Sequence, residues 1–320
     1  MRVAAVDCGT NTIRLLIADL EPATGQQDDV ERQLRYVRLG QDVDRTGRLA
    51  EDAMSRTLAA AEEYAVLCRT YGAERIRIGA TSAVRDAANA EEFLVAMTER
   101  LGARPEVLEG SEEAQLSWLG AMRGLAAELP ADQLVVDIGG GSTELIRGAG
   151  DRIAAVVSLD IGSVRQTERH LTDDPPTAAQ IEAAAADADA AIDGAGGDGA
   201  GVGLAAVGSV IGVAGSITTI AAHVLELQAY DRDQIHHARI PIDNVLSSCA
   251  ALLAAPVDVR RAMPFMPSGR ADVIGGGAVV LGRLLLRLAP TLKAPYLVVS
   301  EHDFLDGLAW SMVEQSAVEE

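Results

Sequence analysis

Apolar and polar positions in the first 130 residues switch repeatedly between a two-residue period and a helical period. Alternating or continuous apolar runs predict strands at residues 2–6, 12–20, 33–39 and 75–80. Helical spacing of apolar residues predicts helices at 50–69 and 91–101. A further helix is expected from about Glu112 to Leu129, because Pro130 disfavours a helix just before it. Alternating strands and helices predict an α/β fold.

The pattern then begins again. Strands are predicted at 134–138, 143–147 and 153–159. VAAVDCGTNTIRLLI at 3–17 and LVVDIGGGSTELI at 134–146 share one plan: an apolar strand ending in Asp, a glycine turn with hydroxyl side chains, and an outgoing strand. One such hairpin is common. Two copies, with Asp7 and Asp137 130 residues apart, indicate an internal duplication at domain scale rather than coincidence.

Residues 199–225 contain no Asp, Glu, Lys or Arg and are long enough for a membrane helix. Six glycines interrupt this stretch, so it is interpreted as a buried strand, a glycine turn and a helix capped by Ser216. Low complexity is confined to 183–203, where a helix end and a surface loop are expected. No membrane partner is expected.

Composition narrows the class of ligand. The 320 residues are 48% hydrophobic and 23% charged, which is globular, and the length favours two domains. The net charge of −20 excludes a general attraction for nucleic acid or anionic membrane, so an anion would need local donors. The only lysine, Lys293, does not follow a glycine, which excludes a G-x-x-x-x-G-K phosphate loop.

Three cysteines, Cys8, Cys68 and Cys249, are far apart and odd in number. They form neither a disulfide framework nor a zinc motif, and they fit a reduced compartment. The N-terminal apolar run is too short for a signal peptide, so a cytoplasmic location is expected.

The turns after Asp7 and Asp137 suit phosphate. Glycines let the backbone approach a ligand, and successive N–H groups and hydroxyls donate to its oxygens. The two hairpins are expected to face each other across a cleft and to clamp a phosphoanhydride. The denser cradle consists of Gly139, Gly140, Gly141, Ser142 and Thr143. Glu144 either joins Asp137 on a hydrated Mg²⁺ or is a solvent-facing charge on an edge strand; taken alone, the second is favoured.

Other polar positions leave two interpretations open. In one interpretation, Ser111 caps a helix and Glu112 and Glu113 only complement the positive end of that helix. In the other, one of these two acids is a general base. Arg85 lies where a strand gives way to a helix and either meets an anion or lies on the surface. The His236–His237 pair lacks a partner at metal-ligand spacing, so a loop is favoured over a zinc site.

Taken together, the motifs resemble the exopolyphosphatase/guanosine pentaphosphate phosphohydrolase (Ppx/GppA) family, within the actin-like phosphotransferase superfamily. They occur in family order over nearly the whole chain. They are DCGTNTIRLLIAD (7–19), RLGQDVDRTGRL (38–49), ATSAVRDAANAEEF (80–93), EGSEEAQLSWLGA (109–121), DIGGGSTELI (137–146), SLDIGSVRQTERH (158–170), GVAGSITTIAA (212–222), GRADVIGGGAVVL (269–281) and VSEHDFLDGL (299–308).

The resemblance implies two duplicated actin-like (ribonuclease H-like) α/β domains with an interdomain cleft. Domain I would comprise 1–129 plus about 301–320, and domain II would comprise 130–300. The implied activity is hydrolysis of a terminal phosphate with Mg²⁺ or Mn²⁺, in a homodimer.

The resemblance also implies roles for individual residues. Glu113 would activate water, and Asp137 and Glu144 would hold the metal. Ile217 would lie beside the chain-binding cleft. The implied phosphate-binding residues are Asp7, Asn11, Thr12, Arg85, Gly139, Gly140, Gly141, Ser142, Thr143, Gly215 and Ser216. Cys8 and Thr12 stand where relatives often carry an aliphatic residue and Ser.

The leading hypothesis is an exopolyphosphatase acting on inorganic polyphosphate. Longer family members continue into a helical C-terminal region, so a preference for short chains is expected here. Guanosine pentaphosphate is the alternative substrate, because no residue in the sequence identifies guanine. A kinase-like phosphotransferase and a non-catalytic nucleotide or polyphosphate sensor are the other classes considered.

Overall fold

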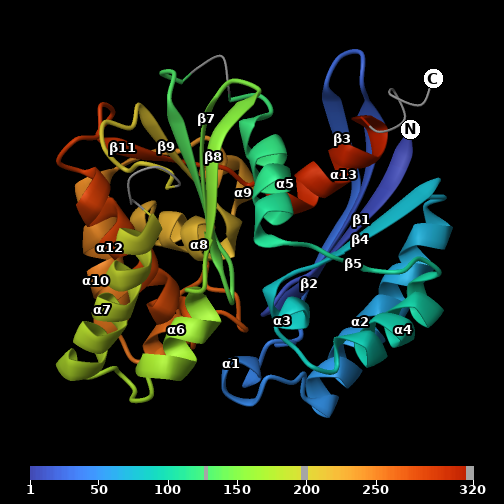
Figure 1. Ribbon diagram of the computed structural model, residues 1–320, viewed down its shortest axis with the longest axis horizontal. Helices are drawn as coiled ribbons and strands as arrows, with labels where there is room; N and C mark the ends of the chain where they lie inside the picture. The colour runs from blue at the N-terminus through green and yellow to red at the C-terminus, as the bar shows by residue number, and fades with distance from the viewer. Residues whose placement is uncertain (126–128, 196–200, 315–320) are drawn as a thin grey trace. The chain divides into compact units, whose positions relative to one another are not determined.

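The computed structural model describes residues 1–125, 129–195 and 201–314, and Figure 1 traces them from blue to red. The chain divides into two compact units. Unit 1 contains Met1–Arg123 and the segment that starts at Phe304, and unit 2 contains Gly124–Asp303. The domain boundaries expected above, 1–129 with about 301–320 and 130–300, stay a prediction about which parts fold independently.

Unit 1 is an α/β layer structure. Its strands are β1 (Arg2–Cys8), β2 (Thr12–Glu21), β3 (Gln26–Tyr36), β4 (Arg75–Ala80) and β5 (Glu106–Val107). Its helices are α1 (Val43–Thr46), α2 (Glu51–Thr70), α3 (Ser82–Arg85), α4 (Ala90–Leu101), α5 (Gly110–Met122) and α13 (Phe304–Glu314). The strand order is β3-β2-β1-β4-β5, with β1 antiparallel to β2 and parallel to β4.

Strand alternation gives the unit 1 sheet two buried faces. Ala4 and Val6 of β1 pack with α2 and α4 on one face. Val3 and Ala5 pack on the other face with apolar residues of α13, such as Trp310. Figure 1 shows the red α13 beside α5 and the blue β1, although these elements are far apart in sequence.

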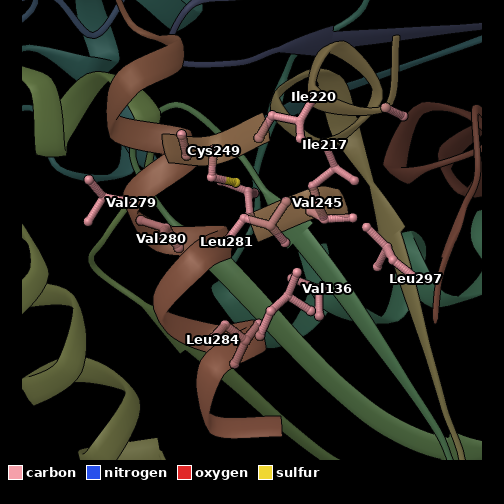
Figure 2. Packing of buried hydrophobic residues seen from close by; sticks show 14 of the residues in the cluster. Val136, Ile217, Ile220, Val245, Cys249, Val279, Val280, Leu281, Leu284 and Leu297 are labelled. Carbon is pink, nitrogen blue, oxygen red and sulfur yellow. The ribbon is translucent and has the colours of Figure 1, made fainter. Parts of the chain in front are cut away.

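Unit 2 repeats this plan. Its strands are β6 (Gln133–Ile138), β7 (Thr143–Ala149), β8 (Arg152–Leu159), β9 (Ser209–Val213), β10 (Arg239–Pro241) and β11 (Tyr296–Val299). Its helices are α6 (Ser163–His170), α7 (Ala178–Ala195), α8 (Ala214–Val224), α9 (Arg232–Ile235), α10 (Ile242–Ala254), α11 (Val257–Arg261) and α12 (Ile274–Leu288). The sheet order is β10-β11-β9-β6-β7-β8. Figure 2 shows Ile217 of α8, Cys249 of α10 and Leu281 of α12 packed together in its core.

The two sheets begin with the same hairpin. Asp7 pairs with Arg14 in the β1–β2 register, and Asp137 pairs with Glu144 in the β6–β7 register. The next pairings, β2–β3 and β7–β8, shift register at positions that are also 130 residues apart, after Ile17 and after Arg147. The predicted α/β class and internal duplication are therefore confirmed.

Two element predictions need correction in their bounds. Strand β3 begins at Gln26, not at residue 33, because it pairs along nearly all of β2; its charged residues hide the strand period. Helix α5 ends at Met122 rather than near Leu129, since the backbone at Arg123 is already extended, with ψ of 124°, and Gly124 follows with a positive φ of 79°. Residues 126–128 of that prediction lie outside the described residues, as do 196–200 of the predicted surface loop.

The stretch at 199–225 contains β9 and the start of α8, as expected. Ser216 is not its cap, because α8 starts at Ala214 and its N-cap is Val213. Among the described helices, none combines the length and the apolar character that a membrane crossing needs.

Candidate active site

The turn between β1 and β2 carries a buried ion pair. The Asp7 carboxylate is 5% exposed and accepts a hydrogen bond from Arg14 Nε at 2.7 Å. The pairing follows from the hairpin register, which places the two residues opposite each other. Sequence reasoning named Asp7 and missed Arg14. Arg14 could have been found only from the hairpin register, which requires the length of the turn to be known.

Surrounding segments fix the shape of this first turn. The Gly9 N–H donates to the Thr12 carbonyl at 3.0 Å, and the Asn11 carbonyl accepts from Val37 and Arg38 N–H. The hydroxyls of Thr10 and Ser82 are 2.9 Å apart and buried, which ties the turn to α3. The structure therefore places Asp7, Asn11 and Thr12 on one hairpin whose turn is held by these hydrogen bonds.

At the start of α5, Glu112 and Glu113 have different surroundings. The N-cap is Glu109, not Ser111, and Glu112 completes a capping box by accepting the Glu109 N–H at 3.0 Å. Glu113 is 9% exposed, and its Oε2 lies 3.5 Å from Nη1 of Arg85. Arg85 also donates to the Leu108 carbonyl at 2.7 Å, so it is held toward Glu113 and is not a surface arginine.

In unit 2, the equivalent hairpin pairs two acids instead of an acid and a base. Asp137 is 6% exposed and Glu144 is 1% exposed. Strand β7 lies between β6 and β8, so the edge-strand interpretation of Glu144 is wrong. Ser158 donates to Glu144 Oε1 at 2.8 Å, which orients the carboxylate.

This pair of acids fits a hard divalent cation. Like charges directly opposite each other destabilise a strand pair, and a cation between them removes that cost. Over the described ranges, no cluster of three or more His, Cys, Asp or Glu side chains is arranged to hold a metal. Two carboxylates nevertheless suffice for Mg²⁺, which keeps several of its own waters.

The turn between β6 and β7 offers unused backbone donors. The Gly139 N–H donates to the Ser142 carbonyl at 3.0 Å, as in the first turn. Within the described residues, the N–H groups of Gly140 and Gly141 donate to no protein acceptor, although Gly141 is buried. Buried N–H groups without an acceptor are rare, and consecutive ones form an anion-binding concavity.

Helix α6 packs against the opposite side of this turn. The Ser163 and Val164 N–H groups donate to the Gly139 and Gly140 carbonyls, each at 2.9 Å. A Cβ atom at Gly162 would lie 2.5 Å from the Gly140 oxygen, so only glycine permits this approach. The Gly139 and Gly140 carbonyls therefore accept hydrogen bonds from α6, whereas the Gly140 and Gly141 N–H groups stay available to a ligand. Thr143, which was predicted to bind phosphate, donates its hydroxyl to the Ile161 carbonyl at 2.6 Å.

The start of α8 lies against an arginine that sequence reasoning missed. A Cβ atom at Gly215 would lie 2.1 Å from a guanidinium nitrogen of Arg270, so that side chain rests directly on Gly215. Ser216 is 1% exposed and Ile217 is fully buried in the core. Arg270 is far from Gly215 in sequence, and no spacing rule predicts the contact.

Cys8 follows Asp7 but is not a nucleophile. Complete burial, with a smaller effect from the Asp7 charge, raises the pKa of the Cys8 thiol well above its ordinary value. The thiol therefore stays protonated, and the thiolate is the reactive form.

Comparisons with known proteins agree with one another. The sequence matches the Ppx/GppA phosphatase family over residues 18–310. It is 44% identical over 318 residues to a Mycobacterium tuberculosis protein named Exopolyphosphatase 2, with 97% of this chain and 98% of the relative covered.

Solved structures give the same result. An exopolyphosphatase-like protein has a TM-score of 0.92 at 41% identity, covering 99% of this chain and all of the other. A Ppx/GppA family member from Aquifex aeolicus has a TM-score of 0.80 at 29% identity, covering 99% of this chain and 98% of that one.

Proposed function

The chain belongs to the Ppx/GppA phosphatase family and is a phosphoanhydride hydrolase, and from this premise we propose that it is an exopolyphosphatase. It would remove the terminal phosphate of inorganic polyphosphate. The observation that carries the proposal is the pair of unused N–H groups at Gly140 and Gly141, next to two buried acids. Such donors suit the oxygens of a phosphoryl group and require no basic patch, which a chain of net charge −20 lacks overall.

In the proposed reaction, water attacks the terminal phosphorus. The water oxygen forms the new P–O bond, and the bond to the bridging oxygen breaks, so the products are orthophosphate and a polyphosphate shorter by one unit. Glu113 accepts the proton of the attacking water. Arg85 Nη1 lies 3.5 Å from Glu113 Oε2, and this ion pair would hold the carboxylate in place.

Asp137 and Glu144 would hold the divalent cation, Mg²⁺ or Mn²⁺. When bound, that cation would neutralise charge on the phosphoryl oxygens. The Gly140 and Gly141 amides and the guanidinium of Arg270 at the start of α8 would bind further oxygens of the terminal phosphates.

The substrate is proposed to be short polyphosphate, in a cytoplasmic homodimer. Each added phosphate brings about one negative charge toward a protein that is itself strongly negative. The three free cysteines are buried, which fits a reducing compartment. The homodimer is carried over from the family resemblance, and light scattering of the purified chain would test it.

The deciding experiment measures orthophosphate release from tripolyphosphate, long polyphosphate, guanosine pentaphosphate and ATP at equal concentrations, with and without Mg²⁺. We expect Mg²⁺-dependent release that is fastest from tripolyphosphate. Faster release from guanosine pentaphosphate would replace the proposal with that activity. Binding without release from any of the four would make the protein a sensor.

A further inference from the structure

The segment 262–273 joins α11 to α12 and carries Arg270 to the start of α8. Two hydrogen bonds hold the backbone at Arg270. Its N–H donates to the Pro267 carbonyl at 3.0 Å, and its carbonyl accepts from the Ile274 N–H at 2.9 Å. The side chain lies on Gly215. Any group that fixes this segment therefore also fixes the position of the Arg270 guanidinium.

Arg260, the fourth residue of α11, is such a group. It is only 2% exposed. Its Nε donates to the Ala255 carbonyl at 2.9 Å, and its Nη1 donates to the Ala271 carbonyl at 3.1 Å. One guanidinium thus bridges the end of α10 and the residue that follows Arg270.

Burying this cation is costly. Removing a charged group from water costs several kcal/mol even after the protein relaxes. Burial lowers the pKa of Arg260, while Asp174 and Asp272 act at longer range in the opposite direction. Both hydrogen-bond acceptors are backbone carbonyls rather than a carboxylate. An apolar side chain here would leave both carbonyls without these donors, and one of them belongs to the residue that follows Arg270.

We propose that Arg260 is a positioning residue for phosphate binding, which acts by holding the Ala271 carbonyl so that Arg270 stays on the start of α8. This rests on the proposed function in the identity of the ligand, a short polyphosphate, and in the binding of its oxygens by Arg270. The fork of a guanidinium donates in two directions at fixed geometry, whereas an ammonium is a single point on a flexible stem. Lysine at 260 therefore keeps the charge but does not span both carbonyls.

The test is a double-mutant cycle of Arg260→Lys and Arg270→Ala, with KM and kcat for tripolyphosphate and calorimetric Kd for tripolyphosphate without turnover. For Arg260→Lys alone, we expect KM and Kd to rise about tenfold, with kcat within about twofold of the unmodified protein. In the Arg270→Ala background, the same change should alter Kd by less than about twofold, since residues that act as a unit are not additive.

Arg147→Lys is the matched control. Arg147 also donates to loop carbonyls of unit 2, at Val202 and Ala205, but it lies on β7 and pairs with Asp132. We expect it to lower thermal stability and to leave KM and Kd unchanged. If Arg260→Lys does not fold, Ala271→Gly replaces it in the cycle, because it loosens the same backbone without touching the buried charge.

Equal losses from Arg260→Lys in both backgrounds would overturn the proposal, because Arg260 would then act on the fold alone. An unchanged Kd in Arg260→Lys, beside a raised Kd in Arg270→Ala, would overturn it as well. The calorimetric measurement separates this inference from the proposed function: if the unmodified protein binds tripolyphosphate without hydrolysing it, the cycle in Kd still decides the role of Arg260.

Discussion

At the residue scale, the two adjacent glutamates of α5 differ in what their carboxylates do. Glu112 accepts the Glu109 N–H and serves the helix start. Glu113 points into a buried position beside Arg85. A general base needs a carboxylate that is not already satisfied by the backbone of its own helix. Glu112 therefore has a structural role at the helix start, and Glu113 remains the proposed base.

The first prediction is that Glu113→Gln lowers kcat by about 10²–10⁴-fold, the usual effect of losing a general base. The amide keeps the size of the side chain but does not accept the proton, so the Kd for tripolyphosphate should stay within a few-fold. Steady-state kinetics and calorimetry check both values. Glu112→Gln is the control and should keep nearly full kcat. If Glu112→Gln were inactive and Glu113→Gln active, the base would be Glu112 and the assignment to Glu113 would be wrong.

The second prediction concerns the acids of the β6–β7 hairpin. Asp137→Asn and Glu144→Gln should each raise the Mg²⁺ concentration needed for half-maximal activity by at least tenfold, because Mg²⁺ needs charged oxygen ligands. Asp7→Asn is the control, because Asp7 occupies the position in the first hairpin that Asp137 occupies in the second. Asp7 has Arg14 as its own counter-charge, so this variant should lose stability without shifting the Mg²⁺ requirement. Mg²⁺ titrations that coincide for all four proteins would remove Asp137 and Glu144 from the metal site.

Site residues differed in how far the sequence could predict them. Asp137, Glu144 and Glu113 lie inside short motifs, where neighbouring residues carry the signal. Arg14 became visible only with the hairpin register, and Arg270 only once a distant loop had folded back on Gly215. Contacts between residues far apart in sequence are set by packing, which no local pattern encodes. The predicted roles of the motif residues themselves stay predictions.

At the element scale, a buried polar network attaches α13 to β3. Arg32 Nη2 lies 2.5 Å from Asp306 Oδ1, and Asp306 is 1% exposed. Gln27 donates to Asp306 at 2.7 Å and accepts from Trp310 Nε1 at 2.9 Å. These hydrogen bonds join α13 to β3, so they hold together parts of unit 1 that are distant in sequence.

The third prediction is that Asp306→Asn destabilises the protein by about 1–3 kcal/mol, since it removes the buried carboxylate that binds Arg32 and leaves that guanidinium only Asp29, which is 31% exposed. Urea unfolding checks this through a lower midpoint at an unchanged slope. Asp258→Asn is the control. Asp258 pairs with Arg261, but its side chain is 91% exposed, so no measurable change is expected. Equal midpoints for Asp306→Asn and the unmodified protein would show that the network does not contribute to stability.

Elements with a strong period, such as β4 and α4, were predicted within a residue of their observed bounds. Strand β3 was not, because its charged residues interrupt the period, and its bounds depend on pairing with β2. The start of α8 was also misplaced by three residues, since the serine at 216 is a better cap by preference than the valine at 213 that holds the position. The capping preference of single residues does not decide the helix start where a strand leads directly into a helix, as β9 does into α8.

At the scale of the whole molecule, duplication and divergence explain the division of roles. The two hairpins share the length of the turn, the register and the hydrogen bond that closes the turn. At the last equivalent position, one copy has Arg14 and the other has Glu144. The first hairpin is therefore neutralised by its own arginine, whereas the second pairs two acids and suits a cation. The same hairpin thus has two different charge states, and the residue that differs is Arg14 in one copy and Glu144 in the other.

The last prediction follows from total charge. With a net charge of −20 and a single lysine, the protein repels any part of a polyphosphate that extends beyond its local donors. Catalytic efficiency should therefore stop rising after the first few phosphates. Repulsion between exposed charges is screened within about 8 Å at physiological salt and about 3 Å at 1 M. Raising the salt should thus improve kcat/KM for chains of hundreds of phosphates more than for tripolyphosphate. Kinetics on size-fractionated polyphosphate at two salt concentrations measure this difference. Efficiency that climbs steadily with chain length at low salt, with processive release, would mean that a basic path along the protein or its dimer outweighs the net charge.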